Sequence, residues 1–289
     1  MKLVEKLSYL AESAAKWVAR KGIECPSCGD RPIQVLDRKF VVTQLRRCRK
    51  CELIYRTPTG NARRMERYYE RRYAEGFTTE FPSDCELAQL LATNFKNTEK
   101  DYSLYLEVLE SIGAQPGMRL LDFGCSWGYG SWQLVAAGFD VSSFEISSRR
   151  CRFARERLRI NAHEAIDEIT GEFDIIFSSH VLEHVSAIGP TIARLWSMLR
   201  RGGKFVAFTP NGSLLYRTKQ TQRWHSSWGM VHPNMLDEKY YKKVFTPAPM
   251  ILASSPYPLA QIRHWASSVD QPVLCDMSGS ELLCVAVKV

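Results

Sequence analysis

Arg119-Leu-Leu-Asp-Phe-Gly-Cys-Ser-Trp-Gly-Tyr-Gly130 is a short apolar segment that runs into a glycine-rich turn. The residues that follow, 131–137, have the composition of a helix. Glycines let the backbone turn tightly and approach a ligand closely, and a helix that begins there presents free N–H groups. The pattern predicts a strand, a loop and a helix around a bound cofactor, although the turn alone also fits NAD or a simple tight loop.

A second apolar segment, Val141–Phe144, ends in Glu145. The carboxylate lies about 20 residues beyond the glycines, where a carboxylate at the end of the second strand accepts the ribose hydroxyls of an adenosine cofactor. NAD and S-adenosylmethionine (SAM) share this feature. Glu145 therefore predicts an adenosine cofactor without choosing between the two.

Three further motifs follow in order: Phe173-Asp-Ile-Ile-Phe-Ser-Ser-His-Val-Leu-Glu-His-Val185, Leu199-Arg-Arg-Gly-Gly-Lys204 and Thr209-Pro-Asn211. With the first stretch they resemble class I SAM-dependent methyltransferases of the broad group that includes the ubiquinone-biosynthesis O-methyltransferases. That group runs close to LD-x-G-C-G-x-G, FD-x-x-…-LEH-V, L-x-x-GG and TPN. The resemblance implies an α/β fold, a Rossmann-like seven-stranded methyltransferase domain preceded by a small zinc ribbon and a helical connector. The last strand, 282–289, is expected to be antiparallel.

The resemblance also implies cofactor-binding roles for residues at matching positions. Asp122 would lie near the methionine amino group of SAM, Glu145 would hold the ribose, and Ile146 would lie against the adenine. The cofactor-binding residues expected on this basis are Asp122, Gly124, Cys125, Ser126, Gly128, Glu145, Ile146 and Ser179. Ser126 replaces the middle glycine of the family, and its small side chain tolerates a tight turn.

Histidine is the usual base near neutral pH when a methyl group is transferred to an oxygen nucleophile. His180, at the end of the fourth strand, would face the transferable methyl and is the first candidate; His232 is the second. His184 is expected to cap or pack. Together with Glu183, these three histidines also loosely resemble the metal ligands of small-RNA 2′-O-methyltransferases, except that His180 stands in place of a glutamate.

Four cysteines near the front of the chain form two C-x2-C pairs, Cys25 with Cys28 and Cys48 with Cys51. Zn²⁺ prefers four soft ligands in a tetrahedron, and each C-x2-C turn offers two thiolates. The intervening residues 33–45 alternate as in a β-hairpin. The sequence predicts a zinc ribbon, and its Zn²⁺ is structural because four protein ligands leave no open position.

We therefore expect four segments along the chain. They are an N-terminal amphipathic helix (1–22), the zinc ribbon (23–57), a helical connector or lid (58–115) and the SAM-dependent methyltransferase domain (116–289). The long segment 211–233 after the fifth strand is expected to be an irregular lid. Its Trp224 and Trp228 either contact the acceptor or pack the lid onto the domain.

The net charge and the cysteine content indicate the environment in which the protein works. The net charge is +8, and residues 20–72 alone hold 15 basic and 6 acidic side chains. Nine cysteines without a secretion signal predict a reducing, cytoplasmic location. No apolar run is long enough for a membrane span.

These features predict SAM-dependent methyl transfer to a hydroxyl or amine, with a small-molecule or saccharide acceptor as the partner. The alternative is an RNA methyltransferase that binds RNA through the basic zinc-ribbon front, with affinity that falls steeply with salt. A third hypothesis is a module that binds SAM without turnover. Neither the acceptor nor the oligomeric state follows from the sequence.

Overall fold

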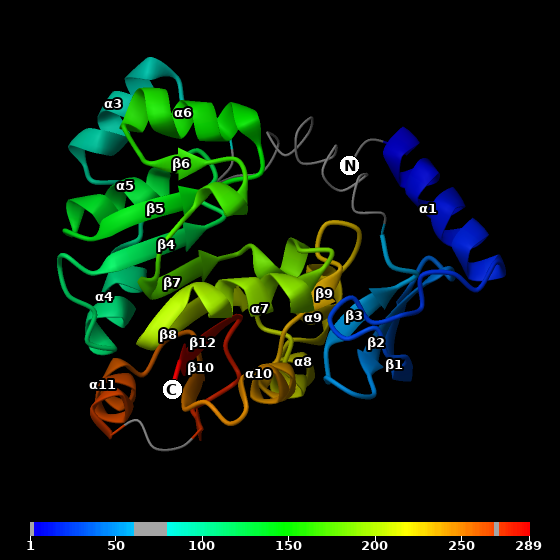
Figure 1. Cartoon of the computed structure of the whole chain (residues 1–289). Coiled ribbons are helices and arrows are strands. Elements are labelled where there is room, and N and C mark those ends of the chain that lie inside the picture. The colour runs from blue at the N-terminus through cyan, green and yellow to red at the C-terminus, as the bar shows by residue number, and fades with distance from the viewer. Residues whose placement is uncertain (1–2, 61–79, 269–271) are drawn as a thin grey trace.

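The computed structural model describes residues 3–60, 80–268 and 272–289. An eight-stranded sheet forms the main body, in the order β11-β10-β12-β8-β7-β4-β5-β6 (Figure 1). Its strands are β4 (Arg119–Phe123), β5 (Asp140–Phe144), β6 (Ala162–His163), β7 (Phe173–Ser179), β8 (Leu199–Pro210), β10 (Met250–Ser254), β11 (Val273–Leu274) and β12 (Glu281–Val287). The predicted α/β class is confirmed.

The strand directions match the expectation from the sequence. Neighbouring strands from β6 through β8 are parallel, whereas β12 is antiparallel to both β8 and β10. The seven expected strands are present, and the two-residue β11 extends the sheet by pairing with β10 at its edge. The carboxyl ends of β4, β5 and β7 therefore meet at one edge, where ligands bind in parallel sheets.

Helices cover both faces of this sheet because its strands alternate their apolar side chains between two core clusters. Ile175 and Phe177 of β7 pack with α4 and α11, whereas Ile176 packs with α7 and α10. The helices are α3 (Asp84–Ala92), α4 (Ser103–Ser111), α5 (Tyr129–Ala136), α6 (Ser148–Leu158), α7 (Ile188–Met198), α8 (Leu214–Lys219), α9 (Thr221–Ser227), α10 (Glu238–Phe245) and α11 (Leu259–Ser268), with 3₁₀ turns η2 (Ile166–Glu168) and η3 (Leu182–His184). The end of the predicted connector thus belongs to the main core through α4.

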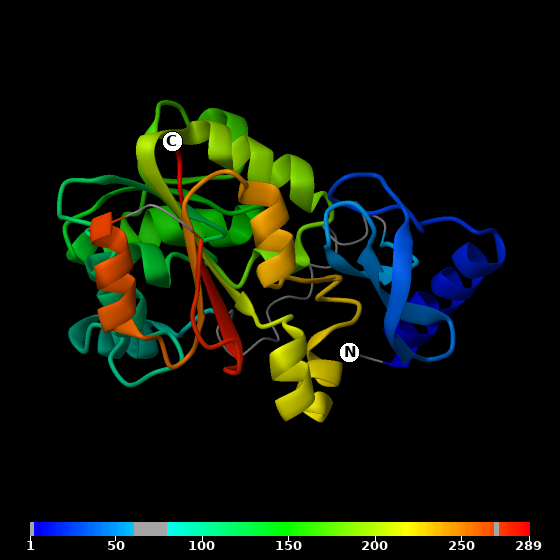
Figure 2. The same cartoon turned by 90° about the horizontal axis from the view of Figure 1, so that it is seen from below.

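A second, four-stranded sheet lies at the front, in the order β1-β2-β3-β9. Its strands are β1 (Pro32–Lys39), β2 (Thr43–Cys48), β3 (Ile54–Thr57) and β9 (Asn234–Met235). The predicted hairpin is confirmed as the antiparallel pair β1–β2. The fourth strand, β9, belongs to the segment between β8 and α10 of the main body, and it pairs with β3 of the front sheet. Figure 2 shows the two sheets side by side.

The N-terminal helix α1 (Leu3–Val18) packs on the front sheet. Tyr9 and Ser13 are buried, and Lys16 donates to the carbonyl of Thr59 at 3.0 Å. Among the residues that the structure describes, no helix has the length and apolar character needed to cross a bilayer.

A buried ion pair joins the front sheet to the main body. Arg47 of β2 donates to the carboxylate of Asp237 at 2.8 Å, and both side chains are almost completely buried. Asp237 also caps α10 by accepting from the amide of Tyr240. Nearby, the hydroxyls of Ser27 and Tyr240 lie 3.0 Å apart. A buried charge needs its partner, so this pair fixes how the two sheets meet.

The Asp237→Asn variant tests this junction. Asparagine is also a good N-cap residue, so the variant keeps the cap on α10 but removes the buried counter-charge of Arg47, which then pairs only with the more exposed Glu52 at 3.3 Å. We expect the unfolding free energy to fall by about 3 kcal/mol, because removing one partner of a buried pair is strongly destabilising. Burial raises the pKa of Asp237 to about 6 although Arg47 opposes the shift, so urea denaturation is measured at about pH 8.

The matched control is Arg49→Ala, which breaks the exposed pair with Asp30 in the same sheet. This variant should lose less than about 1 kcal/mol. Similar losses in the two variants would contradict the importance of the Arg47–Asp237 pair.

Candidate functional site

The glycine-rich loop between β4 and α5 requires left-handed backbone at three alternate positions. Gly124 and Gly128 have φ of +93°, and Ser126 has φ of +53°. Only glycine adopts such angles freely, so Ser126 departs from the residue type that this backbone favours. The amides of Gly124 and Cys125 both donate to the carbonyl of Phe144 at the end of β5, at 2.8 and 3.0 Å. The loop is therefore held against the second strand.

The Glu145 carboxylate ties the loop to the segment that follows β5. The amide of Ser126 donates to its Oε2 at 3.0 Å and the amide of Ser147 donates to its Oε1 at 2.8 Å. Glu145 is only 7% exposed, and burial raises its pKa although these hydrogen bonds oppose the shift. Ile146, immediately beyond it, is 42% exposed. A fixed carboxylate next to an exposed apolar side chain suits a ribose bearing a flat base.

Asp122, at the end of β4, is buried and takes part in a serine network. The hydroxyl of Ser131 donates to Asp122 Oδ2 at 2.6 Å, and the hydroxyl of Ser143 donates to that of Ser131 at 2.9 Å. Burial, with a smaller contribution from nearby Glu145, raises the pKa of Asp122 to about 7 against the opposing effect of the Ser131 hydrogen bond. Two carboxylates this poorly hydrated favour a positively charged ligand.

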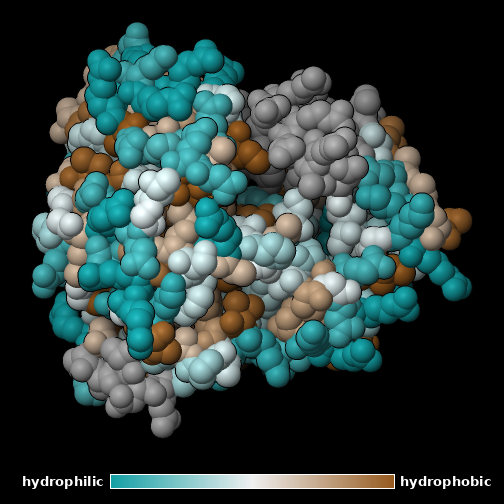
Figure 3. All heavy atoms as spheres, viewed as in Figure 1, coloured by the Kyte–Doolittle hydropathy of each residue, from teal (hydrophilic) through white to brown (hydrophobic). Residues whose placement is uncertain are grey.

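Several features of the loop fit a cofactor with a sulfonium and an adenosine. The hydroxyl of Ser126 is buried and has no hydrogen-bond partner among the described residues. Cys125 is buried in the loop, whereas Ser179 is partly exposed at the end of β7. Figure 3 shows the surface hollowed between the main body and the front sheet. Asp122 and Glu145 would supply the negative charge, and the backbone of the loop would approach the ligand.

His180 follows β7 and has left-handed backbone, with φ of +54°. Its Nε2 lies 2.6 Å from Glu281 Oε1, and its Nδ1 lies 3.5 Å from Glu183 Oε1. Glu281 also accepts from the hydroxyls of Tyr105 and Tyr257 at 2.8 and 2.7 Å. Burial lowers the pKa of His180, but the two carboxylates raise it to about 10. At neutral pH this imidazole is protonated and acts as a positive charge.

His184 and His232 lie together, with ring centroids 4.5 Å apart. The carbonyl of Val231 lies 2.9 Å from His184 Nδ1, and the carbonyl of Ser227 lies 2.7 Å from His232 Nδ1. A carbonyl only accepts, so each Nδ1 donates and each Nε2 carries a lone pair in the neutral ring. Burial lowers the pKa of His184 to about 4. His184 therefore differs from His180 in charge at neutral pH.

Glu183, His184 and His232 form a group of possible metal ligands. One ligand atom from each lies within 4.8 Å of the others. The carboxylate oxygens of Glu183 are buried without a hydrogen-bond partner among the described residues. The three side chains could hold a divalent ion, whereas His180 is directed to Glu281 and is not part of the group.

The predicted irregular lid at 211–233 is not irregular, because it contains helices α8 and α9. Trp224 and Trp228 are buried against Leu36 and Leu45 of the front sheet. The indole of Trp228 donates to Asp37 Oδ2 at 2.8 Å. Both tryptophans therefore pack the segment onto the front sheet rather than presenting a surface to an acceptor.

The four predicted zinc ligands come together in the front sheet. The sulfurs of Cys25 and Cys51 lie 3.5 Å apart, and those of Cys28 and Cys48 lie 3.4 Å apart. Four sulfurs about 2.3 Å from a tetrahedral Zn²⁺ are about 3.8 Å from one another, so the cluster fits this ion. The amides two residues after Cys25 and Cys48 donate to their sulfurs at 3.4 Å. Such N–H groups orient thiolate ligands.

A protein-family model described as a methyltransferase domain matches residues 65–248. This chain belongs to that family. The match includes the glycine-rich loop, Glu145, His184 and His232, whereas the four cysteines and Glu281 lie outside it. The predicted membership is confirmed.

Ubiquinone biosynthesis O-methyltransferases are among the curated relatives of this chain. The enzyme of Aromatoleum aromaticum is 30% identical over 129 residues, 41% of this chain and 55% of the relative. The enzyme of Sinorhizobium fredii is 27% identical over 159 residues, 46% of this chain and 64% of the relative. The chain thus spans little more than half the length of these relatives. The solved structure of the plantazolicin methyltransferase BamL has a TM-score of 0.49 at 12% identity, covering 78% of this chain and 97% of its own.

Sequence reasoning missed the residues that surround the histidines of this site. Glu281 lies at the start of β12, and Asn234 lies in β9, both far along the chain from η3. The side-chain amide of Asn234 donates to the carbonyls of Leu182 and Val185, and so holds the turn that carries His184. No local pattern signals such contacts. The antiparallel placement of the last strand was the one available hint, since it brings the start of β12 to the ligand edge.

Asp122→Asn tests the electrostatics of the loop. Burial raises the folded-state pKa of Asp122 to about 7, above the unfolded value of about 3.9, so ionisation opposes folding and stability is lost as pH rises toward 7. The neutral variant lacks this loss. Its stability relative to the parent should therefore increase between about pH 5 and about pH 8 in ligand-free urea denaturation.

The exposed Asp140→Asn change, in which Asp140 faces Arg119 at 3.6 Å, is the control and should show no such trend. A stability difference between Asp122→Asn and the parent that stays constant with pH would contradict the raised pKa.

Proposed function

We propose that this protein transfers the methyl group of SAM to a hydroxyl or amine of a small molecule or saccharide. The observation that carries the proposal is the loop after β4, whose Ser126 amide donates a hydrogen bond to Glu145. This loop lies in a chain that belongs to the methyltransferase family. SAM supplies a methyl already activated on a sulfonium. The protein's task is then to bind the cofactor, align the acceptor and exclude water.

The proposed cofactor contacts follow from the geometry of the loop. Glu145 would accept the ribose hydroxyls, and Ile146 would lie against the adenine. Asp122 would face the positively charged end of SAM, where a cation also lowers its raised pKa. Gly124, Cys125, Ser126, Gly128 and Ser179 would line the remaining surface of the cofactor.

We assign the general base to His232 rather than to His180. A base needs a lone pair, and the neutral form of His232 presents one at Nε2 because its Nδ1 donates to the carbonyl of Ser227. Both nitrogens of His180 face carboxylates, so its proton is already held. His180 would instead place a positive charge near the acceptor oxygen.

A small acceptor is favoured over RNA by the engagement of the basic side chains. In the front sheet Arg47 and Arg56 are buried. On α6, Arg155 pairs with Glu164 and Arg157 pairs with Asp84. Arginines that are buried or already paired with a carboxylate are less available for phosphates. Binding of bulk RNA that weakens steeply with salt would contradict a small-molecule acceptor.

Turnover of histidine variants tests the proposal. Conversion of SAM to its thioether is measured against a panel of phenols, amines and glycosides. For an acceptor that reacts, His232→Gln should lower kcat by about 100-fold or more, the usual contribution of a general base, and leave cofactor affinity unchanged. His180→Gln should have a smaller effect, because it removes a charge and not the base.

His264→Gln on α11 is the matched control and should retain parent turnover. Two outcomes contradict the assignment of the base. One is full activity of His232→Gln. The other is a count of two metal ions per active chain, because the second ion would occupy the lone pair of His232.

A further inference from the structure

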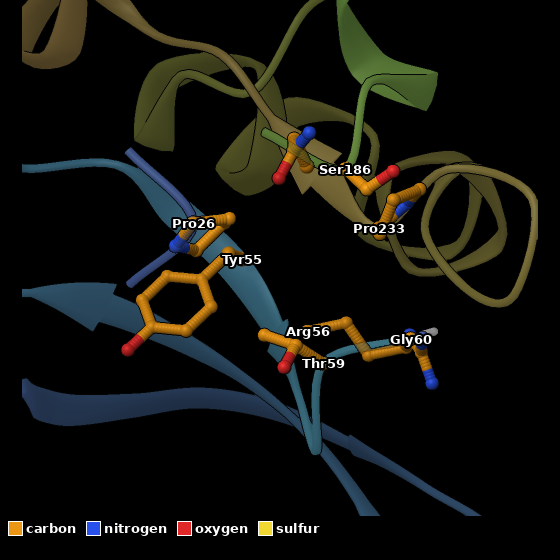
Figure 4. A pocket seen from close by; sticks show the side chains of 8 residues that line it. Pro26, Tyr55, Arg56, Thr59, Gly60, Ser186 and Pro233 are labelled. Carbon is orange, nitrogen blue, oxygen red and sulfur yellow. The ribbon is translucent and has the colours of Figure 1, made fainter. Parts of the chain in front are cut away.

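The segment that leaves β7 turns in two directions. Its first residue, His180, faces β12 of the main sheet, where the Nε2 atom lies 2.6 Å from Glu281 Oε1. Ser186, farther along the segment, lies with Pro233 across a small pocket from Arg56 of the front sheet (Figure 4). The ion pair of His180 with Glu281 thus belongs to the main sheet, whereas the end of the segment meets the front sheet.

Phe208 of β8 gathers the residues around this ion pair. The amide of His180 donates to the carbonyl of Phe208 at 2.9 Å. The rings of Tyr105 and Tyr257 pack on the Phe208 ring, with centroids 4.4 and 5.6 Å away. Both tyrosine hydroxyls donate to Glu281, at 2.8 and 2.7 Å. Two strands, α4 and the segment before α11 therefore hold one carboxylate against the imidazole.

Glu281 is a fixed negative charge. Its side chain is 17% exposed, and its two oxygens accept from His180, Tyr105 and Tyr257. Burial raises the pKa of Glu281, but the hydrogen bond and charge of His180 and the two tyrosine hydroxyls bring it below its ordinary value. Donors on both oxygens leave the carboxylate little freedom to rotate. The residue lies outside the family match at 65–248, so membership of the family does not account for it.

The His180 ring depends on such a partner for its direction. Its backbone is left-handed, which persists in a residue other than glycine only where the surroundings hold it. The side chain is 47% exposed, so packing alone does not fix the ring. Its Nδ1 lies 3.5 Å from Glu183 Oε1, which is too long for a strong hydrogen bond. The shorter contact with Glu281 therefore sets the orientation of the ring.

We propose that Glu281 is a positioning residue of the acceptor site, which directs the imidazolium of His180 toward the acceptor beyond the end of β7. This inference rests on the proposed methyl transfer. Both nitrogens of His180 face carboxylates, so the ring acts on the acceptor by its charge and not by donating a hydrogen bond. Glu281 has no contact with the acceptor in this arrangement and acts through His180 alone.

Labelling with diethyl pyrocarbonate tests the arrangement without any acceptor. The reagent acylates an accessible imidazole nitrogen that carries a lone pair, and mass spectrometry of peptides locates the product. His225 is the internal control in the full-length, zinc-loaded parent. Its side chain is 43% exposed, close to the value for His180, but among the described residues its Nδ1 alone faces a carboxylate, that of Asp37. We expect His180 to react at least about tenfold more slowly, the effect of one charge-assisted hydrogen bond.

Variants then assign the protection of His180 to Glu281. Glu281→Gln keeps the size of the side chain and an acceptor for the tyrosine hydroxyls but removes the charge, and should raise labelling of His180 at least about tenfold. The matched control is Glu168→Gln, which removes an exposed carboxylate 3.6 Å from His163 and should leave labelling of His180 unchanged. The comparison of His180 with His225 needs no variant, so the test stays decisive if Glu281→Gln fails to fold.

A double-mutant cycle tests the role in turnover for any acceptor that reacts. Glu281→Gln should lower kcat as much as His180→Gln does and leave the KM for SAM unchanged. The double variant should be no slower than His180→Gln alone, because both changes remove one oriented charge. A residue with a merely structural role would instead add its own loss to that of His180→Gln.

Three results would overturn the positioning role. They are labelling of His180 as fast as that of His225 in the parent, unchanged labelling of His180 in Glu281→Gln, and losses of kcat that multiply in the double variant. Affinity for S-adenosylhomocysteine is measured on the same samples and should not change in Glu281→Gln. A protein that protects His180 but does not bind S-adenosylhomocysteine would contradict the proposed methyl transfer itself, so the two failures are distinguishable.

Discussion

The buried carboxylate of Glu145 is the contact on which the proposed chemistry depends. It receives one amide from the glycine-rich loop and one from the start of α6, so it fixes the loop relative to the second strand. The left-handed backbone of Gly124, Ser126 and Gly128 makes that approach possible. Because the Glu145 carboxylate is already held in place, little binding free energy is lost in rearranging it when a ligand binds.

The front sheet is more than an appended zinc module, because the main body completes it. Strand β9 pairs with β3, Arg47 pairs with Asp237, and the two tryptophans of α9 and its end pack on the hairpin. The same segment that supplies β9 carries His232 just before it. The four cysteines therefore stabilise a sheet whose last strand leads directly from the proposed base.

The sequence predicted the parts of this molecule that are encoded locally. The first strand, the glycine-rich loop and Glu145 follow one another at a characteristic spacing in the chain. The two C-x2-C pairs likewise indicate the hairpin between them. The ion pair of His180 with Glu281 could not be predicted, since the partners are 101 residues apart and meet only because β12 enters the sheet antiparallel. The same holds for Arg47 with Asp237, because that contact depends on how the two sheets pack.

The most direct test of the central claim is a calorimetric titration of the purified protein with S-adenosylhomocysteine, with NAD as the competing adenosine ligand. The account predicts saturable binding of the thioether, no binding of NAD, and an affinity lowered about 10- to 100-fold in Glu145→Ala, the effect of losing a hydrogen bond to a charged acceptor. Absence of binding, or equal affinity in Glu145→Ala and the parent, would contradict it.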